Sequence, residues 1–374
     1  MNVIANLIGP RAYCWGDFWI LSASHGNFIM AQCPDCDGGL FSPVSRRQFV
    51  QTAGAAAAAM SFGPTWARGD DSAGKPKPEN LVKTLYDSLT PEQKDEICFD
   101  WDHKDDRGLL RMHVSNNWNI TEKKIGDGKF FKKDQQDMIE ALFWGLYNPD
   151  WHDRIKKQLQ DDAQGYGKQQ SIALFGTPGS GKFEFVMTGR HLTIRCDGDS
   201  TEHTAFGGPI FYGHAAKDFN EAPDHPGSVF WDQSKKANAL FQMLDGKQRD
   251  VALIEQAPPE SQVHFSGKSK TIPGLPISEL TADQKAHAQT VLSTLLEPYR
   301  TSDQTEARKC LEAQGGLDRC HIAFYQSGDL GNDKVWDMWR LEGPSFVWHY
   351  RGAPHIHVWV NVADDPSVQI TTRG

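Results

Sequence analysis

Residues 336–361 read WDMWRLEGPSFVWHYRGAPHIHVWVN, and this stretch decides the fold class. Its short runs of Trp, Phe, Tyr, Val and His are typical of strands, and turns that contain Gly and Pro separate them. The two turns are Glu342-Gly343-Pro344 and Arg351-Gly352-Ala353-Pro354. Because three consecutive strands are joined by such short connections, the stretch predicts an antiparallel meander.

Outside this stretch the pattern divides into zones. Strand-like segments cover residues 171–214 and 320–361, and helical patterns fill most of the remaining chain. Two N-terminal capping signals, Thr90-Pro91-Glu92-Gln93 and Thr281-Ala282-Asp283-Gln284, mark helix starts. Further helices are predicted at 134–146, 150–162, 233–256 with a break near Asp245-Gly246, and 303–314.

Helices and strands thus come in blocks, which is typical of an α+β fold. We predict helices packed around an antiparallel β-sheet in a single domain over residues 80–366, with a C-terminal tail at 367–374. A region of this length is long enough to bury a large core.

Composition narrows the class of protein. The chain has 374 residues, of which 39% are hydrophobic and 23% charged, as in an ordinary globular protein. The net charge of −9 argues against nucleic acid as a main partner, since phosphate binding needs a basic surface. No stretch reaches the roughly 18 apolar residues of a membrane span, so we expect no stable membrane insertion.

Residues 45–67 have the features of a twin-arginine export signal. Arg46 and Arg47 stand side by side, and an Ala-rich run leads to Thr65 and Ala67, the small residues of a cleavage site. We therefore predict that the twin-arginine translocase exports the folded protein to the periplasm or the extracellular space.

The predicted leader covers residues 1–67, and residues 68–79, rich in Gly, Asp, Lys and Pro, are predicted to be a disordered linker. The 44 residues before the signal are many for such a leader, and Met30 is an alternative start to Met1. The mature region keeps Cys98, Cys196, Cys310 and Cys320. These cysteines can form two disulfides in any of three pairings, of which Cys310–Cys320 is the most local.

A glycine-rich segment at 176–182, GTPGSGK, follows a strand pattern and has the glycine and lysine spacing of a phosphate-binding loop. Phe183 stands where that motif needs a hydroxyl group for Mg²⁺, and the residues after it are β-branched and aromatic rather than helical. We therefore expect no nucleotide cofactor, and we interpret the segment as a turn between two strands.

Two histidines in the last predicted strand are candidate metal ligands. Alternation places His355 and His357 on one face, about 7 Å apart along the chain, with Ile356, Val358 and Val360 on the opposite, apolar face. Two imidazoles so placed can share one metal ion.

Other candidate residues lie far away in the sequence. His191 and His214 are further possible ligands, which only the fold can bring close to the first pair. Arg340 and Glu342 share a face of an earlier strand and can orient the site or simply pair with each other. The alternative interpretation is that these histidines are hydrogen-bonded members of an aromatic core.

Seven blocks of the mature chain also occur, in this order and spacing, in a known family. They read LTPEQK (89–94), FGTP (175–178), GRHLTI (189–194), GPIFYG (208–213), LP (275–276) with LT (280–281), WRLEGP (339–344) and HIH (355–357). From about Leu81 to Asp365 the chain resembles the DUF3500 family of bacteria and fungi, whose members are often exported.

The resemblance implies that His191, His355 and His357 belong to recurring motifs, and it brings no established reaction. The chain departs from the family's pattern in three places. Arg190 stands where the first of two histidines is usual, His214 where an acidic residue is frequent, and Val360-Asn361 where an Arg-Asp pair is usual.

Two functions fit these residues. The first is a metal-dependent extracytoplasmic hydrolase, in which His191, His355 and His357 bind Zn²⁺ or another divalent ion and His214 is a further candidate ligand. Glu342 would be the general base, and Arg340 would hold an anion. A copper-dependent oxidase is a variant, because imidazoles also suit copper.

The second function is a non-catalytic protein that binds a carbohydrate or another small molecule. Its binding platform would be an aromatic-rich sheet with exposed side chains. The aromatic residues concerned are Trp336, Trp339, Trp348, Tyr350 and Trp359.

Overall fold

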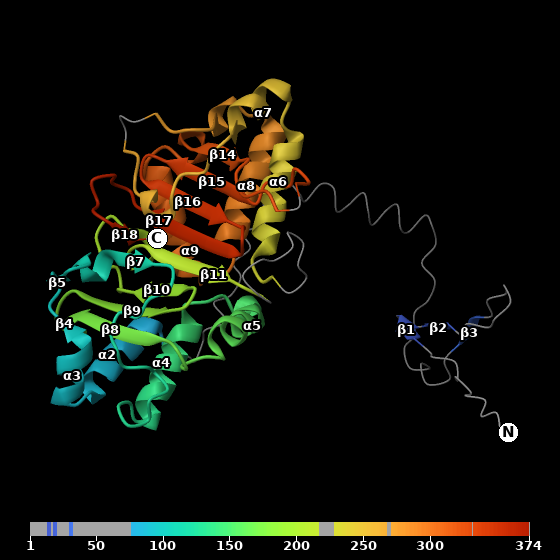
Figure 1. The fold of residues 1–374 in the computed structure, drawn as a ribbon. Coiled ribbons are helices and arrows are strands. Elements are labelled where there is room, and N and C mark those ends of the chain that lie inside the picture. Colours follow the sequence, from blue (N-terminus) through green and yellow to red (C-terminus); the bar gives the residue numbers. More distant parts are fainter. Residues whose placement is uncertain are drawn as a thin grey trace, which may run out of the picture. The chain divides into compact units, whose positions relative to one another are not determined.

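The computed structural model describes residues 76–216, 228–267, 271–330 and 332–373, together with three short strands nearer the N-terminus (Figure 1). The chain divides into two units, Met1–Asp71 and Ser72–Gly374. In the first unit, three strands form an antiparallel sheet: β1 (Tyr13–Trp15), β2 (Phe18–Ile20) and β3 (Met30–Gln32).

The rest of the predicted leader, including the predicted export signal at 45–67, lies outside the described residues, as does the predicted linker up to residue 75. The first helix of the second unit, α2 (Pro78–Ser88), begins inside the stretch that the sequence predicted as linker, because Pro78 occupies its first turn. No helix in the described part of the chain is long and apolar enough to cross a membrane.

One mixed sheet of 11 strands forms the centre of the second unit. Its order is β12-β14-β15-β16-β17-β11-β10-β9-β8-β4, and β13 pairs with β14 beside this path. The strands are β4 (Cys98–Phe99), β8 (Ser171–Gly176), β9 (Phe183–Gly189), β10 (Leu192–Cys196), β11 (Ile210–His214), β12 (Leu253–Ile254), β13 (Leu275–Pro276), β14 (His321–Tyr325), β15 (Met338–Gly343), β16 (Phe346–Arg351) and β17 (Ile356–Val362).

The predicted α+β class is confirmed, and the predicted antiparallel sheet is confirmed only in part. Both strand zones are present, and β15, β16 and β17 form the antiparallel meander. Two pairs are parallel, however: β4 with β8, and β12 with β14. Each joins a two-residue strand at or near one end of the path to a strand far away in the sequence, which the local pattern does not reveal.

Apart from α2, which was not predicted, the helices agree closely with the predictions. They are α2, α3 (Pro91–Ile97), α4 (Lys133–Gly145), α5 (His152–Ala163), α6 (Trp231–Met243), α7 (Gly246–Ala252), α8 (Ala282–Leu296) and α9 (Thr301–Ala313). Thr90 and Thr281 form the predicted capping boxes. The break at Asp245-Gly246 separates α6 from α7, where Asp245 caps the second helix. The prediction of helix as far as residue 256 was wrong, because Leu253 and Ile254 pair with β14.

Smaller elements complete the second unit. Two short pairs lie outside the large sheet: β5 (Lys104–Asp105) with β6 (Gly108–Leu109), and β7 (His113–Ser115) with β18 (Thr371–Arg373). Strand β18 falls in the stretch predicted as a tail. The segment 177–182 joins β8 to β9 in an antiparallel hairpin, as expected of a turn between two strands. All four cysteines of the second unit are free, so none of the three disulfide pairings forms.

The sheet has an apolar face and a polar face where the candidate residues lie. Ile356, Val358 and Val360 of β17 belong to the main hydrophobic core, as predicted. Figure 1 shows α6, α8 and α9 beside this half of the sheet, and α2 and α4 beside β8 and β9. On the other face, Trp359 packs against Val263 in a small separate cluster. His357 and Trp359 therefore point away from the main core, toward the segment around Val263.

Candidate metal centre

Strand β17 and the turn between β9 and β10 bring three histidines close together. His355 immediately precedes β17 and His357 lies within it, so both follow the strand's alternation. His191 belongs to the two-residue turn between β9 and β10. Strand β11 lies between β10 and β17 in the sheet, so the His191 side chain has to reach across β11 to meet the other two.

Gly213 makes this approach feasible. It pairs with His357 across β11 and β17. A Cβ atom on Gly213 would lie 3.3 Å from Cγ of His191 and only 2.3 Å from the carbonyl oxygen of Ile356. The missing side chain therefore leaves the space that the His191 ring occupies.

The backbone of His191 is itself unusual. Its φ is 53°, in the left-handed region that a residue with a side chain adopts at a cost of about 1–2 kcal/mol. Its N–H donates to the carbonyl oxygen of Asn116 at 3.2 Å, which holds the turn in place. Strained residues of this kind cluster at functional sites.

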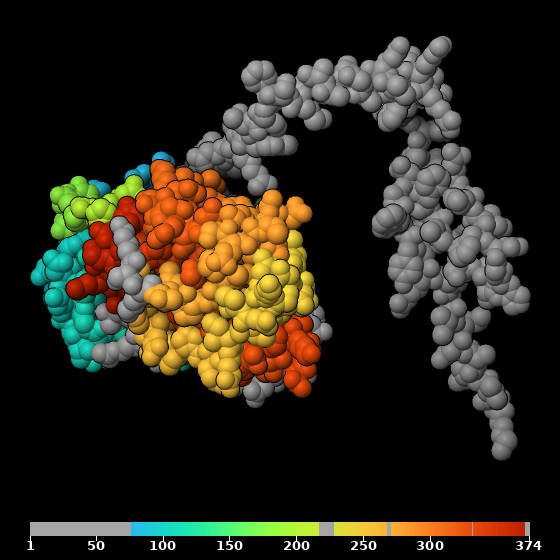
Figure 2. Space-filling view, turned by 90° about the horizontal axis from the view of Figure 1, so that it is seen from above, coloured from blue at the N-terminus to red at the C-terminus, as the bar shows by residue number. Residues whose placement is uncertain are grey.

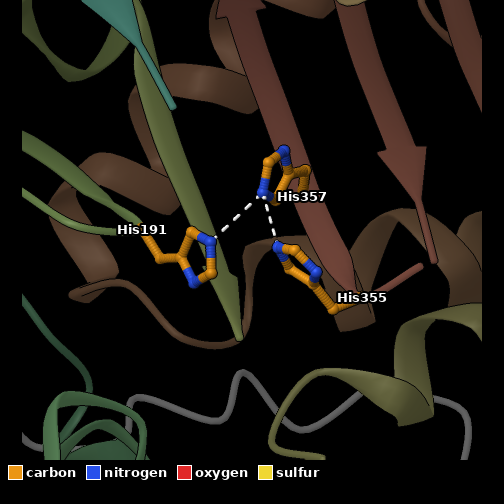
Figure 3. A group of neighbouring side chains, drawn as sticks. All are labelled: His191, His355 and His357. Carbon is orange, nitrogen blue, oxygen red and sulfur yellow. Dashed lines mark hydrogen bonds between the residues drawn. The ribbon is translucent and has the colours of Figure 1, made fainter. Parts of the chain in front are cut away.

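The three rings meet at their Nε2 atoms (Figure 3). Nε2 of His357 lies 3.0 Å from Nε2 of His355 and 3.1 Å from Nε2 of His191. One potential ligand atom from each ring lies within 4.8 Å of those of the other two. The predicted convergence of these three histidines is therefore present in the structure, and the group can hold a metal ion.

Two carboxylates stand behind the rings. Nδ1 of His357 donates to Oε1 of Glu260 at 3.0 Å, and Nδ1 of His191 lies 3.0 Å from Oδ1 of Asp162, close in distance although not aligned as a hydrogen bond. Burial alone would raise the pKa of both acids. Contacts with His357, Arg351 and Trp359 instead lower the pKa of Glu260 to about 2, and those with His191 and Gln158 lower the pKa of Asp162. Both acids are therefore ionised at neutral pH.

The ionised Glu260 fixes the tautomer of the His357 ring. A carboxylate only accepts hydrogen bonds, so Nδ1 of His357 carries the hydrogen and its Nε2 atom carries a lone pair. Burial lowers the pKa of His357 to about 3, which keeps that ring neutral. The Nε2 lone pair of His357 therefore faces the Nε2 atoms of both His355 and His191, and it can accept a hydrogen bond from only one of them. A cation between the rings would be bound by the Nε2 atoms of all three.

The spacing suits a divalent ion. Two imidazole nitrogens, each about 2.1 Å from Zn²⁺ in tetrahedral geometry, are about 3.4 Å apart. The observed distances differ from this by only a few tenths of an ångström. All three side chains are buried, with 2% exposure for His191, 6% for His355 and 5% for His357, so the nitrogens face little competing water.

The fourth candidate ligand, His214, is not part of this group. Its Nδ1 accepts a hydrogen bond from the N–H of Val229, and its Nε2 lies 3.0 Å from Oδ2 of Asp161. Both ring nitrogens are thus engaged elsewhere, and the ring packs as a hydrogen-bonded core histidine.

Arg340 and Glu342 lie on β15, two strands away from β17. Neighbouring strands are about 4.8 Å apart, so their backbones lie roughly 10 Å or more from that of His357. Nη1 of Arg340 lies 3.3 Å from Oε2 of Glu342, and its Nε donates to Nδ1 of His349. Ser266 donates to the other oxygen of Glu342. The structure therefore joins these residues to each other and to the covering segment around Ser266, apart from the three histidines.

Sequence reasoning missed Asp162, Glu260 and Gly213. Asp162 ends the predicted helix 150–162, and Glu260 follows two prolines in an irregular stretch, so neither has a motif that marks it. Gly213 falls in the GPIFYG block, but its importance depends on which ring lies above it.

The aromatic residues proposed as a binding platform are all buried. Trp339, Trp348 and Tyr350 are fully covered, Trp359 is 1% exposed and Trp336 is 8% exposed. Side chains this deeply packed do not form the exposed aromatic platform on the sheet that sugar binding would need.

Comparison with known proteins identifies a family for this chain. A family model described as "Protein of unknown function (DUF3500)" matches residues 76–363, which includes all three histidines of the cluster. No curated protein and no solved structure matches significantly.

Proposed function

Since this chain belongs to the DUF3500 family, whose description names no function, we propose one from the site itself: a metal-dependent hydrolase that binds a divalent ion through His191, His355 and His357. The observation that carries the proposal is the contact between Nε2 of His357 and Nε2 of His191, 3.1 Å apart, while an acid faces the other nitrogen of each ring. Such an arrangement is stable when a cation lies between the rings.

The protein's own groups have distinct tasks in this proposal. Glu260 holds Nδ1–H of His357, and Arg351 and Trp359 in turn hold Glu260, with Nη1 of Arg351 3.3 Å from Oε2 and Nε1 of Trp359 2.9 Å from Oε1. Asp162 faces His191 and accepts a hydrogen bond from the N–H of Ala215. These contacts orient the rings with their Nε2 atoms toward one another before any ion binds. The rings therefore lose little conformational freedom when the ion binds.

Three imidazole ligands leave further coordination positions for water and substrate. A bound Zn²⁺ ion would lower the pKa of a water molecule toward neutrality and polarise the bond to be hydrolysed. Imidazole ligands also suit copper, so a copper-dependent oxidase is the variant to be distinguished by metal content. Arg340 and Glu342 receive no step in this proposal, because they contact each other on a different strand.

The twin-arginine pattern predicted at 45–67 supports a function outside the cytoplasm, where the substrate would be a small molecule or a carbohydrate. Export of a folded protein agrees with a buried metal site, since the ion can be loaded before the chain crosses the membrane. N-terminal sequencing of the exported protein tests this part, and a mature N-terminus at Arg68 is expected.

The decisive experiment is metal analysis of the purified full chain after loading with Zn²⁺ or Cu²⁺. We expect about one ion per chain, retained through gel filtration and lost in His357→Ala. His203→Ala is the matched control, because His203 is an exposed histidine that pairs with Asp364. If the wild-type chain retains no ion under any loading condition, the metal site is excluded.

Hydrolysis is tested separately with chromogenic esters, phosphate esters and glycosides. The proposal expects activity that a chelator removes and the metal restores, and that His357→Ala lacks. A chain that binds its ion but cleaves none of the three substrate classes would count against a hydrolase and leave the metal site intact.

A further inference from the structure

A cavity of about 500 Å³ lies on elements that carry none of the three histidines. The end of α6, α7, β12 and the segment before β15 border it, with Phe241, Arg249, Asp250, Leu253, Lys334 and Trp336 in its lining. Figure 2 shows the yellow atoms of the α6–α7 region beside the orange-red atoms of the chain near residue 330. The volume is in the range of small-molecule sites.

Two aromatic side chains form an apolar corner of this cavity. The rings of Phe241 and Trp336 meet edge to face, with centroids 5.7 Å apart. Trp336 lies outside any strand, yet the side chain of Asn238 holds both its backbone groups, accepting from its N–H at 2.7 Å and donating to its carbonyl oxygen at 3.0 Å. The indole is thus fixed in place before a ligand arrives.

The charged residues of the lining favour an anion. Arg249 is held in place by its donation to the carbonyl oxygen of Gln242 at 2.7 Å, with its guanidinium 5.6 Å from the Phe241 ring. Lys334 adds a second cation, for which the described residues show no ion pair. Asp250 is the one acid among the described residues that line the cavity, and it is exposed. Two cations and one acid leave a net positive charge.

We propose that this cavity binds a small organic acid, whose ring packs against Phe241 and Trp336 and whose carboxylate faces Arg249 and Lys334. The site is independent of the metal centre, because it shares no lining residue with it.

Ligand-observed NMR on the full chain tests this proposal with three probes. Benzoate has both the ring and the charge, benzamide has the ring without the charge, and acetate has the charge without the ring. We expect benzoate to bind in the millimolar range, benzamide about tenfold more weakly, and acetate without measurable saturation transfer.

Three variants change the charge of the region one residue at a time. Lys334→Gln should weaken benzoate binding about threefold, and Asp250→Asn should strengthen it by a similar factor, because one removes attraction and the other removes repulsion. Lys247→Gln is the matched control. Lys247 is an exposed cation of α7, the helix that also carries Asp250, but its side chain does not line the cavity. All three residues are exposed or at the rim, so the fold should tolerate each change.

The proposal is overturned if benzoate gives no signal, or if benzoate and benzamide bind equally well. It is also overturned if Lys334→Gln and Asp250→Asn leave benzoate binding unchanged relative to Lys247→Gln. A loss of metal binding at the histidine cluster would affect none of these outcomes.

Discussion

Oε1 of Glu260 lies 3.0 Å from Nδ1 of His357 and 2.9 Å from Nε1 of Trp359, so one carboxylate oxygen receives two N–H groups from the same strand. His357 and Trp359 are two residues apart and therefore point to the same face. The carboxylate reaches them from the short helical turn Glu260–Gln262, far away in the sequence. It fixes the orientation of the His357 ring from the side opposite the other two histidines.

Glu260→Gln tests this orienting role. The amide has nearly the same shape but no charge, so it holds Nδ1–H less strongly and makes the ring a weaker ligand. We expect the affinity for Zn²⁺, measured by competition with a chelator, to fall at least about tenfold. Glu255→Gln, an exposed change a few residues earlier, should leave the affinity unaltered. Equal affinities in both variants would remove Glu260 from the metal site.

His214→Gln separates a structural histidine from a ligand. Both nitrogens of His214 have partners, Asp161 and the N–H of Val229, and the ring is buried. We expect the free energy of unfolding in urea to fall by about 1–3 kcal/mol, because a buried partner is lost. The metal content should stay at the wild-type value. A variant that folds normally but loses its ion would restore His214 as a ligand.

How much of the site follows from the sequence depends on distance along the chain. Alternation within one strand placed His355 and His357 on one face. It placed the apolar residues Ile356, Val358 and Val360 on the other face. Their meeting with His191 was a hypothesis that no local pattern could decide. It depends on a turn at the far side of β11 and on the missing side chain of Gly213.

The same distinction holds for the fold. The capping boxes at Thr90 and Thr281 depend only on residues three positions apart in the sequence, and both are present in the structure. Leu253 and Ile254 continue a helical pattern, but they form a strand because β14 offers them backbone partners. Pairing of this kind is a tertiary effect that overrides local preference. Asp162 and Glu260 were missed for a similar reason, since an acid is recognised as a partner only when its histidine is beside it.

Gly213→Ala should disturb the fold and the site together. Its new methyl group would meet the carbonyl oxygen of Ile356 at 2.3 Å and Cγ of His191 at 3.3 Å, so β11 and β17 have to separate locally. We expect a loss of about 1–3 kcal/mol in the free energy of unfolding and weaker metal binding.

Gly246→Ala is the control for the glycine substitution. Gly246 begins α7, and a Cβ atom there would meet nothing within 4 Å. Its stability should be unchanged or slightly higher, because alanine favours the helix. If Gly213→Ala behaves like Gly246→Ala in urea unfolding and in metal affinity, the missing side chain at Gly213 is not required for either property.

Asp337→Asn should change how stability depends on pH. Burial raises the pKa of Asp337 to about 7, and the nearby Asp329 and Asp333 add to this, although Oδ2 accepts a hydrogen bond from the N–H of Leu330 at 2.7 Å. In the unfolded chain an aspartate has a pKa of about 3.9. The folded state therefore binds more protons between about pH 4 and pH 7, and its stability falls as the pH rises through that window.

Asparagine stays neutral and can still accept from Leu330, so the variant should lack this fall. Urea unfolding at about pH 8 should find the variant about 1–3 kcal/mol more stable than the wild type, with little difference near pH 4. Asp95→Asn, an exposed change on α3, controls for the loss of one negative charge. Parallel pH profiles for the wild type and Asp337→Asn would mean that the buried carboxyl does not take up a proton on folding.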